Sequence, residues 1–184
     1  QMGAVKRMHA RDGSLWTSDA AGQAEIQRRL GWLEAPDCAD SSLNAGAALR
    51  ETLLGEGYTH TLLLGMGGSS LAPEVLALSN AEPGQGRGLG LAILDSTDPG
   101  QVRDALERSP IEKTLYIVSS KSGGTAEVNA FLDAAWALVV GKLGENAGQH
   151  FIAITDPGTS LETAARERKF RAIYSGDATI GGRN

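Results

Sequence analysis

The sequence predicts an α/β fold with a doubly wound, five-stranded parallel sheet. From about residue 58 onward, short apolar runs alternate with segments of helical spacing, which is the order of a parallel sheet joined by helices. The apolar runs are continuous, as expected for strands buried on both faces. Because crossovers between parallel strands are right-handed, helices should cover both faces of the sheet. The expected domains are residues 1–57, a helical extension packed on the sheet, and residues 58–184, the sheet domain.

Two helices are expected before the first strand. Ser18 and Asp19 have the residue types that cap a helix, and that helix should run to about Leu30. The polar segment Asp37–Asn44 is expected to be a linker. A second helix is expected over Ala45–Leu54.

The sheet domain is expected to contain five strands and the helices between them. The strands are expected at Thr61–Met66, Leu91–Asp95, Thr114–Val118, His150–Thr155 and Arg171–Tyr174. The helices are expected at Leu71–Ser79, Gln101–Arg108, Thr125–Val140 and Thr159–Lys169. The third of these helices is the longest, and its apolar residues recur at helical spacing: Val128, Phe131, Leu132, Ala135 and Val139.

The composition limits the class of protein. The 184 residues are 41% hydrophobic and 21% charged, which is typical of a soluble globular protein. A formal net charge of −5 argues against a nucleic-acid partner or an anionic membrane surface. No apolar run approaches the roughly 20 residues of a membrane span. Cys38 is the single cysteine, so no intrachain disulfide can form, which fits a cytoplasmic location.

Two loops at the carboxyl ends of expected strands carry the residues of an anion site. Ligands of doubly wound sheets bind beyond the carboxyl ends of the strands. Gly65–Ser70 passes from strand to helix through three glycines and two serines. Ser119–Thr125 offers four hydroxyls and two glycines just before a helix begins. Amides and hydroxyls can bind a phosphate through directed hydrogen bonds without a strong net charge.

Each of these loops also has an interpretation without a ligand. Gly65–Ser70 can be a tight turn between a strand and a helix, and Ser119–Thr125 can simply cap the next helix. Lys121 can contact a phosphate or remain solvated. The presence of two such loops at the same sheet edge favours the ligand interpretation.

A dinucleotide-binding domain is a competing interpretation. Gly65 and Gly67 open a G-x-G-x-x-G pattern, and Asp95 stands where an acid would bind a ribose. The pattern is incomplete, because Ser70 occupies its last glycine position. A dinucleotide site also gives no reason for the hydroxyl cluster at Ser119–Thr125.

The remaining chemistry-bearing residues predict no metal centre. No group of His, Cys, Asp and Glu has the spacing of metal ligands. His60 and His150 lie at the amino ends of strands, opposite the expected site, and are not expected to be catalytic. Asp95 and Asp98 are expected to cap the following helix.

Three motifs together resemble the phosphoglucose isomerase family, specifically its first sugar-isomerase (SIS) domain. They are Gly65–Pro73, Ser120–Glu127 and Gly181–Arg183, in the order and spacing of that family. The resemblance implies a SIS-type, flavodoxin-like three-layer sandwich. Further similarity points to bacterial proteins that fuse a transaldolase to the isomerase, although no transaldolase segment is present in the sequence.

The resemblance implies interconversion of glucose 6-phosphate and fructose 6-phosphate without a metal or cofactor. The hydroxyls of Ser120, Ser122 and Thr125 would hold the phosphate of the sugar. The amides around Lys121 and Gly123 would add to this binding.

The resemblance also assigns residues to the sugar and to the reaction. Gly68 and Ser69 would line the sugar. Arg183 would stabilise negative charge on the enediolate intermediate. Glu127 matches an acidic position of the family motif, and it can equally complement the helix dipole.

Two departures from the family bear on activity and on the extent of the chain. Gly124 stands where many relatives carry a threonine, and Asn184 replaces the usual aromatic residue after the arginine. The family's glutamate base, its ring-opening histidine and a further lysine have no counterpart in this sequence, so we expect an inactive fragment of a larger enzyme. The parent is expected to be a homo-oligomer or a transaldolase fusion. A SIS module that senses sugar phosphates without catalysis is the alternative.

Overall fold

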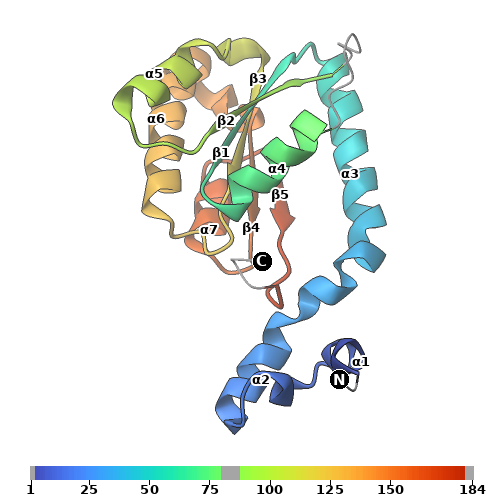
Figure 1. The fold of residues 1–184 in the computed structure, drawn as a ribbon. Helices are drawn as coiled ribbons and strands as arrows, with labels where there is room; N and C mark the ends of the chain where they lie inside the picture. Colours follow the sequence, from blue (N-terminus) through green and yellow to red (C-terminus); the bar gives the residue numbers. More distant parts are fainter. Residues whose placement is uncertain (1–2, 80–87, 181–184) are drawn as a thin grey trace. The chain divides into compact units, whose positions relative to one another are not determined.

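A computed structural model describes residues 3–79 and 88–180 of the chain (Figure 1). It contains two compact units, Gln1–Gly46 with Asp177–Asn184, and Ala47–Gly176. The second unit holds the whole sheet and both loops that the sequence singled out. The domain boundary expected at residue 57, and the packing of the extension on the sheet, stay predictions.

From the first strand onward, the order of elements is the predicted one. The strands are β1 (His60–Gly65), β2 (Gly90–Leu94), β3 (Thr114–Ser119), β4 (Phe151–Thr155) and β5 (Ala172–Ser175). The α-helices of the described residues are α1 (Ala4–His9), α2 (Ala20–Arg29), α3 (Ala35–Gly55), α4 (Gly68–Ser79), α5 (Pro99–Glu107), α6 (Ala126–Leu143) and α7 (Ser160–Glu167). Short 3-10 helices occupy Gly13–Leu15, Gly31–Glu34, Ile111–Lys113 and Gly144–His150.

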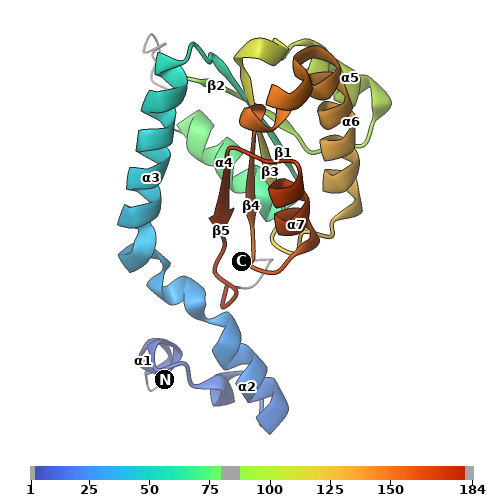
Figure 2. The same cartoon turned by 180° about the vertical axis from the view of Figure 1, so that it is seen from behind.

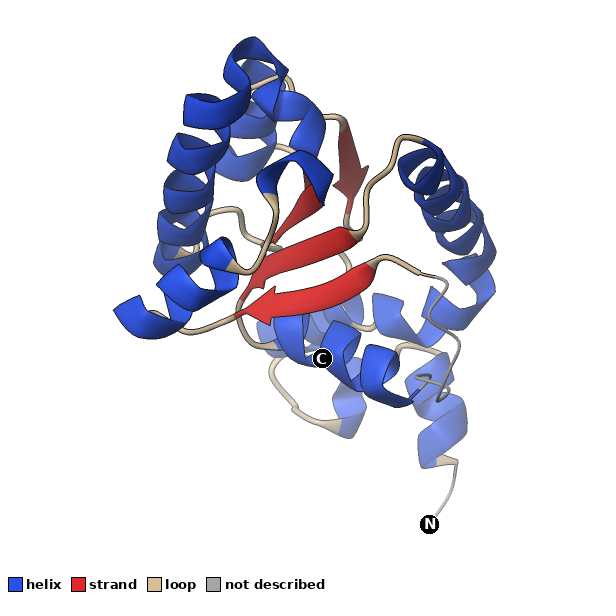
Figure 3. Ribbon diagram, turned by 90° about the horizontal axis from the view of Figure 1, so that it is seen from above, coloured by secondary structure: helices blue, strands red, loops and turns tan. Residues whose placement is uncertain are grey.

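The five strands form one parallel sheet in the order β2-β1-β3-β4-β5. Figure 3 shows the strands of this sheet from above, with helices around them. The chain goes from β1 to β2 on one side and then returns past β1 to build β3, β4 and β5 on the other. This strand order is that of flavodoxin-like, doubly wound sheets. The predicted fold class is therefore confirmed.

Helices cover both faces of the sheet. The larger apolar core lies between the sheet and α5, α6 and α7, which share one side of it in both views (Figures 1 and 2). The five apolar residues predicted to form the buried face of α6 are all buried there: Val128, Phe131, Leu132, Ala135 and Val139. On the opposite face, a smaller core joins Leu53 at the end of α3 to Leu115 and Ile152. This burial fixes the strands, and hence the loops that leave them.

The polar linker expected at Asp37–Asn44 is wrong, because α3 runs without interruption through this segment. Pro36 lies in the first turn of α3, where a missing N–H removes no helical hydrogen bond. Asp37 is also in that first turn and complements the helix dipole. The side chains of residues 41–48 are exposed, so polar residues with low helix propensity face water there.

Side chains cap the starts of three helices, and at α5 the capping residue is Asp98, not Asp95. Asp19 accepts a hydrogen bond from the Gly22 amide at the start of α2, and Asp98 accepts one from Gln101 at the start of α5. Thr159 accepts from the Glu162 amide at the start of α7. These side chains satisfy amides that have no partner within the helix.

Candidate functional site

The candidate site lies at the carboxyl ends of β1 and β3. These strands are neighbours, with Gly65 paired to Ser119 at their ends. The connection after β1 leads to β2, whereas the connection after β3 leads to β4 on the opposite side. A reversal of this kind opens a crevice between the two loops, which is where ligands bind in open α/β sheets.

The loop after β1 turns directly into α4. Gly67 has a φ of +58°, a conformation that glycine adopts readily. Its carbonyl accepts hydrogen bonds from the amides of Ser70 and Leu71, at 3.0 and 2.9 Å, and so starts the helix. The Ser70 hydroxyl is buried and donates to the same carbonyl. Gly68 is exposed and Ser69 is half-buried, so these two predicted residues lie at the accessible start of α4.

The loop after β3 gathers the predicted hydroxyls. Ser120 is 4% exposed, and its Oγ lies 3.1 Å from Thr125 Oγ1. The Ser122 hydroxyl accepts a hydrogen bond from the Gly124 amide at 3.3 Å, and its side chain faces solvent. The structure therefore brings Ser120 and Thr125 together, with Ser122 on the exposed rim of the same turn.

Thr125 differs from the N-cap residues of α5 and α7. It is the N-cap of α6, yet its side chain makes no capping hydrogen bond with the helix. Asp98 and Thr159, in contrast, cap α5 and α7 with their side chains. The hydroxyl of Thr125 is directed to Ser120 instead. Because the N-terminal amides of a helix carry partial positive charge, an uncapped start of α6 favours an anion over the simple capping interpretation.

A third loop, between β4 and α7, holds the loop after β3 in place. The Ser120 amide donates to the Ile154 carbonyl at 3.0 Å, and the Asp156 amide donates to the Lys121 carbonyl at 3.1 Å. The Ser160 hydroxyl donates to the Gly123 carbonyl at 2.8 Å. Sequence reasoning treated this third loop only as a helix start. Its position after a parallel strand was the signal that could have assigned it to the site.

Gly123 is required by both conformation and space. Its φ is +66°, and it is buried. A Cβ at this position would lie 2.6 Å from the Cβ of Thr159 and 3.0 Å from the Leu161 nitrogen. The loops after β3 and β4 therefore approach as closely as only glycine allows.

The remaining predicted residues occupy different surroundings. Lys121 forms an ion pair with Asp156, whose two carboxylate oxygens lie 2.9 and 2.7 Å from its Nζ. Glu127 is half-buried in the first turn of α6. Arg183 lies outside the described residues.

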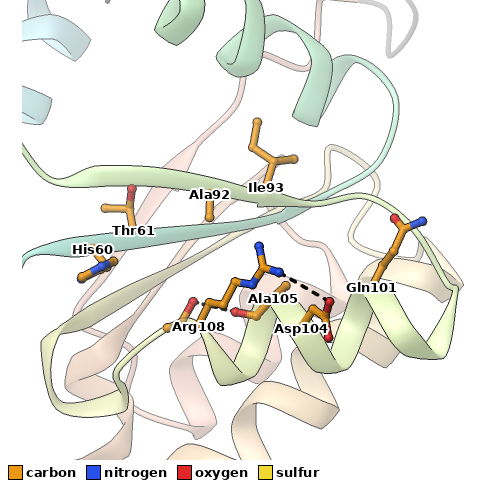
Figure 4. Close-up of a pocket in the computed structure, with 9 residues that line it drawn as sticks. His60, Thr61, Ala92, Ile93, Gln101, Asp104, Ala105 and Arg108 are labelled. Atoms are coloured by element: carbon orange, nitrogen blue, oxygen red, sulfur yellow. Dashed lines mark hydrogen bonds and ion pairs between the residues drawn. The ribbon is translucent and has the colours of Figure 1, made fainter.

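A separate cavity of about 520 Å³ lies away from these loops, between α5 and the strands β1 and β2 (Figure 4). His60, at the amino end of β1, lines it, and its Nδ1 lies 2.7 Å from the Thr59 hydroxyl. Asp104 of α5 and Arg108, the residue that follows this helix, line it as well and form an ion pair at 3.7 Å. His60, Asp104 and Arg108 are thus already paired with neighbours, unlike the uncapped start of α6.

The described residues hold neither a metal-binding cluster nor a membrane-spanning helix. In residues 3–79 and 88–180, no three His, Cys, Asp or Glu side chains gather in a way that could hold a metal ion. No helix in this described part of the chain is long and apolar enough to cross a membrane.

Known proteins are similar to this chain over most of its length. The family model described as phosphoglucose isomerase matches residues 42–183. A glucose-6-phosphate isomerase from Prochlorococcus marinus is 33% identical over 134 residues, which cover 72% of this chain and 25% of that protein. One from Geobacter sp. (strain M21) is 35% identical over 136 residues, covering 70% of this chain and 24% of that protein. The chain thus spans about a quarter of the length of these relatives.

Solved structures show the same fold. A hypothetical protein from Thermus thermophilus superposes with a TM-score of 0.78 and 26% identity, over 97% of this chain and 40% of the other. A glucose-6-phosphate isomerase from Chlamydia trachomatis superposes with a TM-score of 0.63 and 21% identity, over 96% of this chain and 31% of the other.

Proposed function

The chain belongs to the phosphoglucose isomerase family, and from this premise we propose that it is the sugar-phosphate-binding domain of an aldose–ketose isomerase. The parent enzyme interconverts glucose 6-phosphate and fructose 6-phosphate through an enediolate. The chain covers only part of its relatives, so its own share in this reaction is argued from the loops at the carboxyl edge.

The observation that carries the proposal is the uncapped start of α6 beside a cluster of hydroxyls. Ser120 and Thr125 are 3.1 Å apart, and neither hydroxyl caps the helix. A phosphate in this position would accept hydrogen bonds from these hydroxyls, from Ser122, and from the amides around Lys121 and Gly123. The partial positive charge of the helix N-terminus adds to this attraction.

The sugar then extends toward the loop after β1. Gly65 and Ser119 end neighbouring strands, so the two loops leave the sheet side by side. Gly68 and Ser69 would line the sugar, with glycine allowing the substrate to approach the backbone closely. Glu127 would stand at the edge of the phosphate site. Arg183 would stabilise the enediolate, as its match to the family motif implies.

The proposal also limits what this chain does alone. Isomerisation requires a base that removes a proton next to the carbonyl carbon, and among the described residues of the carboxyl edge we find none in that role. We therefore expect binding without turnover. The affinity of a substrate held mainly by its phosphate should be near millimolar, about −4 kcal/mol.

An affinity series tests the proposed function. We expect fructose 6-phosphate and glucose 6-phosphate to bind near millimolar concentration, and fructose without its phosphate to bind at least tenfold more weakly. A coupled isomerase assay should show no turnover by the purified chain. Equal binding of fructose and fructose 6-phosphate would contradict the phosphate site, and measurable turnover would contradict the missing base.

The same series separates the alternatives. A sugar-phosphate sensor would bind the same ligands, and a helix-turn-helix encoded upstream in the parent gene would identify it. A dinucleotide-binding domain would bind NAD instead and would depend on Asp95. A second SIS domain with a catalytic glutamate, encoded downstream, would support the isomerase.

A further inference from the structure

The only lysine in the loop after β3 is held by an acid from the loop after β4. Both carboxylate oxygens of Asp156 contact Lys121 Nζ, at 2.9 and 2.7 Å. The side chain of Lys121 is 28% exposed and that of Asp156 is 19% exposed. The pair is therefore better shielded from water than a surface ion pair such as that between Lys142 and Glu112, whose side chains are 57% and 53% exposed.

The backbone reinforces the same pairing. The Asp156 amide donates to the Lys121 carbonyl at 3.1 Å, so the two residues are joined by main chain and side chain together. Gly176 follows β5, and a Cβ there would lie 2.6 Å from Asp156 Oδ1. The carboxylate of Asp156 is thus enclosed on one side by Gly176 and on the other by Lys121.

This arrangement has an electrostatic consequence for an anion in the loop. A lysine beside a phosphate site is ordinarily expected to bind the phosphate as a point charge. Here the positive charge is matched by a carboxylate at hydrogen-bond distance, so the pair presents no net charge to the site. Phosphate would then be bound by amides, hydroxyls and the α6 N-terminus.

We propose that Asp156 is a positioning residue, which holds the Lys121 ammonium against the loop after β4 and keeps the phosphate site close to electrically neutral. This inference rests on the proposed function. Neutral donors select the phosphate by geometry, and the substrate leaves the site without breaking a direct ion pair. Lys121 contributes to binding through its backbone amide, and its side chain is part of the support of the loop.

A double-mutant cycle tests the proposal on the purified chain, with inorganic phosphate and fructose 6-phosphate as probes. Lys121→Met leaves the Asp156 carboxylate uncompensated, so phosphate affinity should fall by roughly three- to tenfold. Asp156→Asn removes the negative charge that faces the ammonium, so affinity should rise by a similar factor of roughly three to ten. Combining both substitutions removes both charges and should recover most of the original affinity.

The dependence of binding on salt separates positioning from a general effect on folding. Because Asp156→Asn removes the carboxylate charge beside the Lys121 ammonium, phosphate binding in this variant should be more sensitive to ionic strength than in the unmodified chain. Lys142→Met is the matched control, since it removes one lysine from an ion pair at the other end of α6. It should change neither the phosphate affinity nor its salt dependence.

The pattern of affinities across the variants distinguishes a positioning role of Asp156 from direct phosphate binding by Lys121 and from a purely structural ion pair. Opposite changes in the two single variants, with recovery in the double variant, support the proposal. Equal losses in Lys121→Met and in the double variant would show that the lysine binds phosphate directly, and would overturn it. Losses in both single variants with unchanged salt dependence would show a purely structural pair, and would overturn it too. If the unmodified chain binds neither probe, the proposed function fails, and this inference fails with it.

Discussion

At the carboxyl ends of β1 and β3 the loops consist mainly of glycine, serine and threonine, whereas the amino ends of the strands are bordered by large charged and aromatic side chains. Arg171 donates to both carboxylate oxygens of Glu56, at 2.6 and 3.1 Å, and to the Gln149 carbonyl at 2.7 Å. Its guanidinium also lies 5.3 Å from the centre of the Tyr58 ring. These groups are satisfied by one another, so this cluster contributes to stability and offers little to a ligand.

The difference between the two ends shows how binding and stability can be separated on one sheet. Small residues at the carboxyl edge leave amides and hydroxyls accessible. Hydrogen bonds between the loops offset the entropy cost of ordering these loops. Large residues at the amino edge close the core. Substitutions at the carboxyl edge should therefore affect binding, and substitutions at the amino edge should affect stability. A substitution at the amino edge that weakens phosphate binding would contradict this division.

The largest expected effect is that of Gly123→Ala. Alanine would have to adopt the positive φ of Gly123, and its Cβ would lie 2.6 Å from the Cβ of Thr159. We expect the free energy of unfolding to fall by about 2–4 kcal/mol, measured by urea denaturation. Gly67→Ala is the matched control, because Gly67 has a similar φ of +58° and a Cβ added there would have no atom within 4 Å. Equal losses in both variants would contradict the close approach of the two loops.

The next effect concerns the amino edge. Arg171→Met leaves the Glu56 carboxylate without this partner and should lower the free energy of unfolding by about 2 kcal/mol. Phosphate affinity should not change, because Arg171 lies at the end opposite the loops. Arg103→Met is the control, since Arg103 is exposed and its ion-pair distance to Asp104 is 4.0 Å. A loss of phosphate binding in Arg171→Met would contradict the claim that the amino edge serves stability and not binding.

The part of the fold that follows from local pattern was predictable. Continuous apolar runs at residues 61–66 and 114–118 became neighbouring parallel strands, since burial on both faces requires apolar residues throughout. The helical structure of Asp37–Asn44 was not predictable. Low helix propensity indicates a loop only where the segment is not part of a longer helix. Exposed polar residues within α3 carry no apolar periodicity that would reveal the helix.

The candidate site was predictable only where it depends on local sequence patterns. Serines and glycines after β1 and β3 are visible as local patterns, and parallel topology brings them to one edge. The pairing of Lys121 with Asp156 depends on two loops 35 residues apart, and no periodicity encodes it. Thr159 and Ser160 have the pattern of a helix start, so their contact with the loop after β3 required the structure.

A smaller effect concerns the pH dependence of stability. Burial lowers the pKa of His150 below its ordinary value of 6.5, and the nearby Arg171 guanidinium lowers it further, while Thr114, Glu112 and Glu56 oppose this. The unfolded chain therefore binds a proton at a higher pH than the folded chain. The stabilisation is fully present above pH 6.5 and is lost as pH falls through the lowered pKa. His150→Gln should flatten the dependence of unfolding free energy on pH as the pH falls below 6.5; an unchanged slope would contradict this assignment.

The smallest expected effect is that of Ser122→Ala. Its hydroxyl is on the exposed rim of the loop and accepts one hydrogen bond from the Gly124 amide at 3.3 Å. Removing it should weaken phosphate binding about threefold and leave the free energy of unfolding within about 0.5 kcal/mol of its original value. Isothermal titration with inorganic phosphate measures the first quantity. An unchanged affinity would remove this hydroxyl from the site and sharpen the assignment to Ser120 and Thr125.

The position of the ligand tests the account most directly. Two-dimensional NMR spectra of the chain, recorded during titration with fructose 6-phosphate, report which amides respond. We expect the largest shift changes at Gly67–Ser70 and Ser119–Thr125, at the carboxyl edge of β1 and β3. Shift changes gathered instead around His60, Gln101 and Arg108, which line the cavity beside α5, would contradict it.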